Sequence, residues 1–392
     1  MNYAESVRFL YSLGNEVKAA KLGLDRMAVL LEALGEPHRA CEFIHVAGTN
    51  GKGSVCAMLE SALRIAGRRT GLYTSPHLES PTERIRICGE PVSEARFATA
   101  FDTVHEAAER LLASGALDAH PTYFETVTAM AFVLFRESAV ETAVIEVGLG
   151  GTLDATNVIR PRLAVVTPID FDHEKFLGSS IESIATEKAG ILKPGVPAVF
   201  AAQRPEADAI LQARARELGI QPVTTSQWSV RDLLLDAYGS RFSAVRPARP
   251  SQQSAPEIPI ECPLAGEHQI ENALTAVAAL DALGFPSETI REGIRRTRWP
   301  GRLERARQSP EIILDGAHNP AGARALAAYI ERFFERRRVW LVYGAMRDKA
   351  VAEMTGILFP LAERVIATAP DQARAVRPET IPELAAHPHM QV

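Results

Sequence analysis

The sequence predicts an α/β protein of two domains, a large one with a mostly parallel sheet and a smaller one behind it. Short, continuously apolar segments alternate with longer stretches of helical periodicity, as in a parallel sheet covered on both faces. At 392 residues the chain exceeds the size at which a single core stops growing. The alternation restarts after Trp299-Pro300-Gly301, which places the predicted boundary between residues 298 and 299.

The first domain, residues 1–298, is predicted to contain five central strands and at least six helices. The apolar runs that predict the strands are residues 43–46, 70–74, 142–147, 163–167 and 198–201. Helical spacing is found in residues 55–66, 94–113, 124–136, 205–218, 269–283 and 287–296. Residues 246–259 are rich in Pro, Ser and Gln and predict an exposed loop.

The second domain, residues 299–392, repeats the pattern on a smaller scale. Strands are predicted at residues 312–314, 339–342 and 364–368, with helices that begin at Ala321 and Lys349. These elements predict a separate small sheet with its own helices.

Composition limits the classes of function. A net charge of −5 argues against nucleic acid as a partner, because such proteins carry a basic surface. The four cysteines lack metal-type or redox spacing, and we expect them to be reduced in a cytoplasmic protein. No apolar stretch is long enough for a bilayer and the first residues lack a signal-peptide core, so no membrane partner is expected.

A glycine-rich segment, Gly48-Thr49-Asn50-Gly51-Lys52-Gly53-Ser54, connects the first predicted strand to a helix. In this setting backbone N–H groups surround phosphate oxygens, Lys52 supplies positive charge and Ser54 offers a hydroxyl to Mg²⁺. The segment differs from the standard P-loop because Gly53 separates the lysine from the serine. An ordinary glycine-rich turn remains the alternative, although the flanking strand and helix favour phosphate binding.

Two acidic motifs follow predicted strands. Glu146 ends the strand at residues 142–147, and Asp170-Phe171-Asp172-His173 follows the strand at 163–167. Ligands of open α/β sheets bind beyond the carboxyl ends of the strands, so both motifs are candidates for metal or acid–base chemistry. Taken singly, a solvated strand-end glutamate and a hydrogen-bonded structural histidine are the more common explanations.

Two further motifs stand at helix ends. Glu187-Lys188-Ala189-Gly190 closes a helical pattern, and a simple C-terminal cap explains it. Asp315-Gly316-Ala317-His318-Asn319-Pro320 joins a strand to a helix within six residues. A plain turn needs the glycine and proline but not Asp, His and Asn together, which favours a functional loop.

Taken in order, these motifs resemble the folylpolyglutamate synthase/dihydrofolate synthase family of the Mur-ligase group. The resemblance extends from the first residues to about Ala375 and also includes Thr74-Ser75-Pro76-His77-Leu78, Glu83-Arg84-Ile85 and Asp154-Ala155-Thr156-Asn157. It implies a P-loop ATPase domain with a Rossmann-like C-terminal ligase domain. The implied reaction is ADP-forming: a dihydropteroate or folate carboxylate is phosphorylated by ATP, and L-glutamate then forms an amide.

The resemblance also implies roles for individual residues. Lys52, Lys188 and His318 would be catalytic, with Lys188 carboxylated by CO₂ on its side-chain nitrogen. Two Mg²⁺ ions are implied, and a monovalent cation is left open. Ser75, Glu146 and His173 would be the ligands of Mg²⁺. ATP would contact Thr49, Asn50, Gly51, Lys52, Gly53, Ser54, Gln269, Asn272, Arg302 and Asp315. The pterin-bearing substrate would contact Leu22, Asp25, Arg26, Thr122, Tyr123, Phe124, Glu125 and Asp154.

Departures from the family and two competing functions complete the prediction. Thr152 stands where many bacterial members have Arg or Lys, and the chain ends before a closing strand that we expect in the small sheet. A Mur-type UDP-sugar peptide ligase would need a domain before Gly48, where only 47 residues precede it. A noncatalytic nucleotide switch would have no use for Ser75, Lys188 or the turn at 315–320. We expect a monomer.

Overall fold

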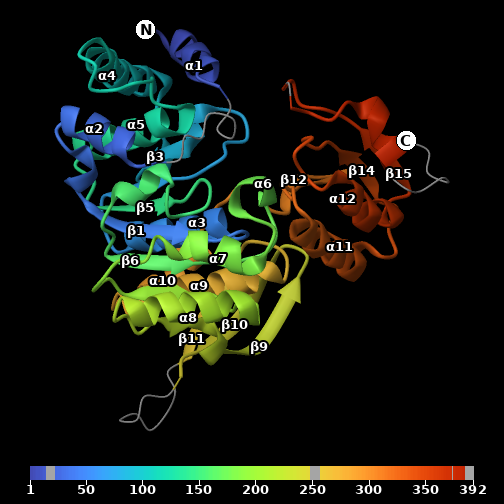
Figure 1. Ribbon diagram of the computed structural model, residues 1–392. Helices are drawn as coiled ribbons and strands as arrows, with labels where there is room; N and C mark the ends of the chain where they lie inside the picture. Colours follow the sequence, from blue (N-terminus) through green and yellow to red (C-terminus); the bar gives the residue numbers. More distant parts are fainter. Residues whose placement is uncertain (15–22, 248–256, 373, 385–392) are drawn as a thin grey trace.

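The computed structural model describes residues 1–14, 23–247, 257–372 and 374–384. Its centre is an eight-stranded sheet with the order β4-β3-β2-β5-β1-β6-β7-β8 (Figure 1). Strands β2, β5, β1, β6, β7 and β8 are parallel, and β3 pairs antiparallel with both β2 and β4. The strands are β1 Glu42–Ala47, β2 Thr70–Tyr73, β3 Ile85–Ile87, β4 Glu90–Pro91, β5 Thr142–Glu146, β6 Leu163–Val166, β7 Ala198–Phe200 and β8 Val223–Thr224. The five predicted strands are confirmed as β1, β2, β5, β6 and β7.

Helices cover both faces of this sheet. Successive residues of each strand point to opposite sides, so each central strand contributes side chains to a core on either face. Ile44 and Val46 of β1 pack into a core with α3, α9 and α10, whereas Phe43 packs with α4 and α5. Ala47 joins a third core with α7 and α8. The helices are α1 Tyr3–Ser12, α2 Asp25–Ala33, α3 Lys52–Ile65, α4 Glu94–Ala113, α5 Tyr123–Glu137, α6 Glu174–Leu177, α7 Ile181–Ala189, α8 Pro205–Glu217, α9 His268–Ala282 and α10 Ser287–Arg295.

A three-stranded antiparallel sheet, β11-β10-β9, was not predicted. It consists of β9 Ser229–Asp236, β10 Gly239–Val245 and β11 Glu257–Cys262. The predicted loop at 246–259 is wrong at its end, because β11 begins at Glu257, while residues 248–256 lie outside the described residues. Ile258 and Ile260 face the core and Pro259 faces outward, so the edge strand accommodates a proline.

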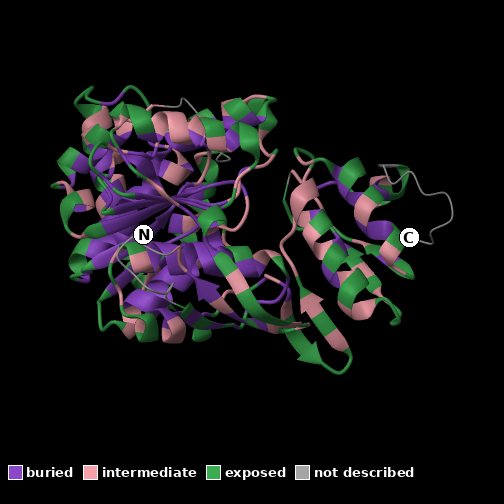
Figure 2. Ribbon diagram, turned by 90° about the horizontal axis from the view of Figure 1, so that it is seen from below, coloured by how far each residue is buried: buried purple, intermediate pink, exposed green. Residues whose placement is uncertain are grey.

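The C-terminal elements form a second lobe beside the large sheet (Figure 1). Instead of one small sheet, the structure has two pairs, antiparallel β12–β13 and parallel β14–β15. The bounds are β12 Glu304–Gln308, β13 Glu311–Leu314, β14 Trp340–Tyr343, β15 Arg364–Ala367, α11 Pro320–Phe334, α12 Val351–Leu358 and α13 Ile381–Leu384. This lobe has one small hydrophobic cluster of its own, whereas a second cluster also includes Ala265 of the large lobe, and Figure 2 shows fewer buried residues in the small lobe than in the large one. We therefore propose 1–298 and 299–392 as the domains.

Every helix within the described ranges is too short or too polar to traverse a bilayer.

Candidate active site

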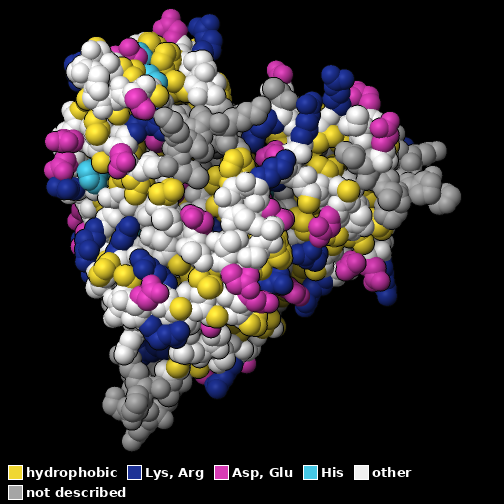
Figure 3. All heavy atoms as spheres, in the orientation of Figure 1, with side chains coloured by type: hydrophobic (Ala, Val, Ile, Leu, Met, Phe, Trp, Pro, Cys, Tyr) yellow, Lys and Arg dark blue, Asp and Glu magenta, His cyan; other side chains and the backbone are white. Residues whose placement is uncertain are grey.

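A cavity of about 850 Å³ lies between the two lobes, where the surface is indented in Figure 3. Residues at the carboxyl ends of β1, β2, β5 and β6 line one side, and the turn at 315–322 lines the other. This is the position at which open α/β sheets bind ligands. The predicted residues that line it are Thr49, Asn50, Gly51, Lys52, Gly53, Ser54, Ser75, Thr122, Phe124, Glu125, Glu146, Asp154, His173, Lys188, Gln269, Asn272, Arg302, Asp315 and His318.

The glycine-rich segment forms a cradle at the start of α3. The N–H groups of Thr49 and Asn50 donate to Pro168 O at 2.9 and 3.3 Å. Those of residues 51–54 have no acceptor among the described residues, as expected for the first turn of a helix. Gly51 has φ 85° at the N-cap, and a Cβ there would lie 2.1 Å from Asn272 Oδ1. Free amides and the positive end of the helix dipole suit this cradle to phosphate.

The unusual Gly53 has a packing explanation. A Cβ at this position would lie 2.9 Å from Nε1 of Trp299, the residue at the proposed domain boundary. Any side chain here would displace the indole and with it the segment that leads into the second lobe. The extra glycine therefore allows the phosphate cradle to contact the interlobe connection.

Two lysines converge on one carbonyl of the cradle. Lys52 Nζ donates to Gly48 O at 3.1 Å and to Thr49 O at 3.0 Å, and Lys188 Nζ donates to Gly48 O at 2.8 Å. Lys188 lies on α7 and is 5% exposed. Burial, with the positive charge of Lys52 second, lowers the pKa of Lys188 to about 7. An uncharged amine is thus readily available at neutral pH, which the simple helix-cap interpretation does not explain.

Glu146 at the end of β5 is a buried carboxylate with a free oxygen. Its Oε2 accepts from the Ser75 N–H at 3.0 Å, whereas Oε1 has no hydrogen-bond partner among the described residues. Burial raises the pKa of Glu146, and the nearby Lys52 opposes this rise. A buried carboxylate with a single hydrogen bond is costly, so a cation at its other oxygen would stabilise it. This donor set suits Mg²⁺, which prefers oxygen ligands.

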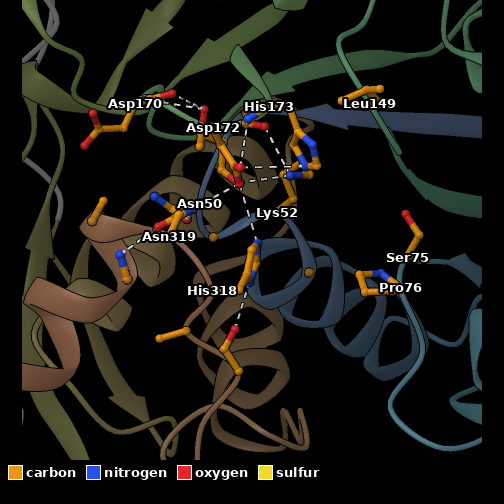
Figure 4. A pocket seen from close by; sticks show the side chains of 18 of the residues that line it. Asn50, Lys52, Ser75, Pro76, Leu149, Asp170, Asp172, His173, His318 and Asn319 are labelled. Atoms are coloured by element: carbon orange, nitrogen blue, oxygen red, sulfur yellow. Dashed lines mark hydrogen bonds and ion pairs between the residues drawn. The ribbon is translucent and has the colours of Figure 1, made fainter. Parts of the chain in front are cut away.

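His173 lies between the cradle and the second lobe, as Figure 4 shows. Burial, together with the charges of Lys349 and Lys52, lowers the pKa of His173 to about 4, although Asp172 acts against this. The imidazole is therefore neutral at pH 7, and its Nε2 lies 3.4 Å from Lys349 Nζ, a donor that a metal ion would have to replace at that nitrogen. Ser75, Glu146 and His173 all line the cavity, and Figure 4 shows Ser75 across the cavity from His173.

Three residues to which the sequence assigned no individual role connect the lobes, although two of them, Asp172 and Asn319, belong to the predicted motifs. Asp172 Oδ1 accepts from Lys349 Nζ at 2.7 Å, and its Oδ2 accepts from Asn319 Nδ2 at 3.2 Å. Asn319 Nδ2 also donates to Asn50 Oδ1 at 2.9 Å (Figure 4). Burial opposes ionisation of Asp172, but His318, His173 and Lys349 hold its pKa well below the usual value. The strand-end position of Asp172 and the polar turn around Asn319 were the available signals, whereas Lys349 offered none.

The remaining ATP candidates lie on the side of the cavity formed by α9 and residues 301–318. Gln269 Oε1 accepts from Asn272 Nδ2 at 3.0 Å, which fixes both amides. Both oxygens of Asp315 accept backbone amides, from Leu303 at 3.0 Å and from Ala317 at 2.9 Å. Asp315 therefore holds the turn on which the half-exposed His318 stands, 3.6 Å from Asp172.

The candidates for pterin contact divide into two groups. Thr122, Phe124, Glu125 and Asp154 line the cavity, whereas Asp25, Arg26 and Tyr123 do not, and Leu22 lies outside the described residues. Arg26 Nε donates to both Glu125 oxygens at 3.1 and 3.0 Å and supports that side chain from behind. Asp154 accepts from the N–H groups of Gly148 and Leu149 and so fixes the wall of the cavity.

The pair between Arg26 and Glu125 leads to a stability prediction. Glu125 also completes the capping box of α5 with Thr122. Replacing it with alanine removes the carboxylate that pairs with the largely buried Arg26 guanidinium and the oxygen that accepts the Thr122 N–H, so that half of the capping box is lost. We expect Glu125→Ala to lower the free energy of unfolding by about 2–4 kcal/mol in denaturant titration. Glu137→Ala, at the exposed end of the same helix, is the control, and equal stability of the two variants would contradict this role.

Thr152 is held at the C-terminal end of α7, beside Lys188. Its N–H donates to Glu187 O at 2.9 Å and its Oγ1 to the same oxygen at 3.2 Å. This position next to Lys188 explains how a small polar residue fits there. Thr152 is exposed and does not line the cavity.

Comparison with known proteins gives a consistent result. The family model described as Mur ligase middle domain matches residues 46–280, and that described as Mur ligase, glutamate ligase domain matches residues 301–392. Folylpolyglutamate synthase of Lacticaseibacillus casei is 37% identical over 362 residues, which cover 90% of this chain and 82% of that protein. Dihydrofolate synthase/folylpolyglutamate synthase of Mycobacterium tuberculosis is 36% identical over 386 residues, with 91% and 76% covered. The structure of Mycobacterium tuberculosis folylpolyglutamate synthase complexed with ADP superposes with a TM-score of 0.88 at 34% identity, covering 98% of this chain and 85% of that one.

Proposed function

The chain belongs to the folylpolyglutamate synthase/dihydrofolate synthase family of Mur ligases and is an ATP-dependent ligase, and from this premise we propose that it joins L-glutamate to a folate or dihydropteroate carboxylate. One observation supports the proposal most strongly. A single cavity contains a phosphate cradle, a buried carboxylate with a free oxygen, a neutral imidazole and a buried lysine that titrates near neutrality.

The first step must bring two anions together, the triphosphate and the carboxylate that it phosphorylates. The amides of residues 51–54 and the ammonium of Lys52 would bind the β- and γ-phosphates, with Lys52 exchanging its carbonyl contacts for phosphate oxygens. Ser75, Glu146 and His173 would hold Mg²⁺, which supplies positive charge to the transferring phosphoryl group. Carboxylation would turn Lys188 from a cation beside Lys52 into an anion able to support a second Mg²⁺.

The second step needs glutamate next to the activated carboxyl carbon. The α-amine attacks this carbon, a C–N bond forms, and phosphate leaves with one oxygen of the original carboxylate. The turn at 315–320, with His318 at its exposed tip, borders this side of the cavity. Thr122, Phe124 and Glu125 at the start of α5 would orient the pterin-bearing substrate.

Release of phosphate from ATP tests the proposal. We expect release to require both L-glutamate and an acceptor, and dihydropteroate and tetrahydrofolate assayed side by side distinguish the two possible acceptors. Release with ATP alone, unaffected by either co-substrate, would favour a nucleotide switch and overturn the proposal.

The metal role of Glu146 has its own test. Glu146→Gln keeps the size of the side chain but removes the charge beside the cradle. We expect the Mg²⁺ concentration for half-maximal rate to rise about 10- to 100-fold, because a direct ligand is lost. Glu206→Gln, on the exposed face of α8, should titrate like the native protein. A metal titration of Glu146→Gln that superimposes on the native curve would exclude Glu146 as a ligand.

The described residues of one copy of the chain line the cavity without a second copy, and we propose a monomer, which light scattering at working concentrations would show. All four cysteines are unpaired, which agrees with our proposal of a cytoplasmic location.

A further inference from the structure

We propose that His105, Glu109 and His120 form a binding site for a transition-metal ion of the Zn²⁺ type, outside the interlobe cavity. His105 and Glu109 lie one turn apart on α4, and His120 lies in the segment 114–122 that joins α4 to α5. One ligand atom from each residue lies within 4.8 Å of the others. Two imidazoles and a carboxylate are a common protein ligand set for Zn²⁺ and are poorly suited to Mg²⁺.

Each histidine directs an unpaired nitrogen towards the same carboxylate. Nδ1 of His105 is 3.9 Å and Nε2 of His120 is 3.7 Å from Glu109 Oε1. Both distances are too long for hydrogen bonds. Both nitrogens are buried and have no hydrogen-bond partner among the described residues, which is costly for polar atoms. A cation between the three side chains would satisfy both nitrogens and the carboxylate at once.

The tautomer of His120 supports metal binding. Its Nδ1 lies 2.9 Å from Pro121 O, and because a carbonyl oxygen can only accept, Nδ1 carries the proton. Nε2 then has a lone pair directed at Glu109. A ligating histidine whose other nitrogen donates to a backbone carbonyl is the arrangement seen at many metal sites.

The contacts of Glu109 with the two histidines need only small adjustments. Bonds of about 2.0–2.2 Å in a tetrahedron place ligand atoms roughly 3.3–3.5 Å apart. The two measured separations exceed this range by a few tenths of an ångström. Glu109 is 55% exposed and free to rotate inward, whereas the two imidazoles are held by ring contacts with Phe9 at 4.5 and 5.4 Å between centroids. Three protein ligands leave one position for water.

The location indicates what a bound ion would do. Phe9 belongs to α1, which packs against α4, and the segment with His120 leads directly to Thr122 at the start of α5 (Figure 1). An ion here would tie α1, α4 and the beginning of α5 together. Since Thr122 and Glu125 line the cavity, the site would stabilise the segment that we propose to face the pterin.

Titration of the metal-stripped full chain with Co²⁺, in saturating Mg²⁺, tests this proposal through the visible absorption of the bound ion. We expect one Co²⁺ in the native chain, and an affinity at least roughly 100-fold lower in His105→Ala and His120→Ala. Two controls should keep native binding: His38→Ala, whose buried Nδ1 is also unpaired but lies outside the cluster, and His173→Ala, which removes the cavity histidine.

Glu109→Ala tests the site without the risk that the variant misfolds, because its exposed side chain can be removed without disturbing the core. Zn²⁺ should raise the melting temperature of the native chain and have little effect on Glu109→Ala. The proposal is overturned if the native chain binds no Co²⁺, if the cluster variants bind it with native affinity, or if binding disappears only in His173→Ala.

Discussion

Lys52→Met is expected to abolish measurable turnover, with kcat at saturating ATP at least about 1,000-fold below the native value. The ammonium lies at the start of α3, 3.1 and 3.0 Å from two cradle carbonyls, where it can transfer to phosphate oxygens. Negative charge on the transferring group increases towards the transition state, so the loss should affect kcat more than the binding of ATP. Steady-state kinetics with saturating acceptor and glutamate measure this directly.

Lys175→Met is the matched control, since Lys175 is exposed on α6 and does not line the cavity. It should retain native kinetics. If Lys52→Met turns over at the native rate with saturating ATP, the cradle is not the phosphate site.

Lys188 should make activity dependent on CO₂. Its carboxylation requires the neutral amine, and with a pKa of about 7 the neutral fraction increases as pH rises through 7. Protein prepared without CO₂ should therefore regain activity on addition of bicarbonate, faster at pH 8 than at pH 6. Lys188→Met should lose about 100- to 1,000-fold in kcat whether or not bicarbonate is present.

The pH dependence of the stability of Lys188→Met tests independently whether the pKa of Lys188 is lowered in the folded protein. A lowered pKa in the folded state means that the protonated, buried amine opposes folding fully below pH 7 and progressively less above it. Lys188→Met should thus be more stable than the unmodified native chain by about 1–4 kcal/mol at pH 6, with a smaller difference at pH 9.

Lys193→Met, a half-buried lysine outside the cavity, is the control for activity. Native activity in Lys188→Met would contradict the proposed role.

Local sequence patterns were sufficient for much of the fold. The central strands are apolar on both faces, and the structure places them within one or two residues of the predicted ranges. The glycine-rich loop was recognisable because strand, loop and helix follow one another directly. The sheet β9–β11 was missed, since β9 is mostly exposed and the inward residues of β11 alternate with Pro259 and glutamates.

The site was only partly predictable because several contacts join distant segments. Lys349 and Asp172 are 177 positions apart, and nothing near Lys349 distinguishes it from a surface lysine. The hydrogen bonds from the Thr49 and Asn50 N–H groups to Pro168 O form because β6 lies beside β1. Likewise, only the packed structure shows that Asp315 holds a turn with both oxygens and that Tyr123 does not line the cavity.

The fate of the acceptor's carboxylate oxygen tests the central proposal most directly, namely that this cavity brings a triphosphate and a substrate carboxylate into reaction. An acceptor labelled with ¹⁸O in that carboxylate would be incubated with ATP and L-glutamate, and the released phosphate analysed by mass spectrometry. Phosphorylation of the carboxylate predicts one ¹⁸O in each phosphate released. Unlabelled phosphate accompanying amide formation would contradict the account.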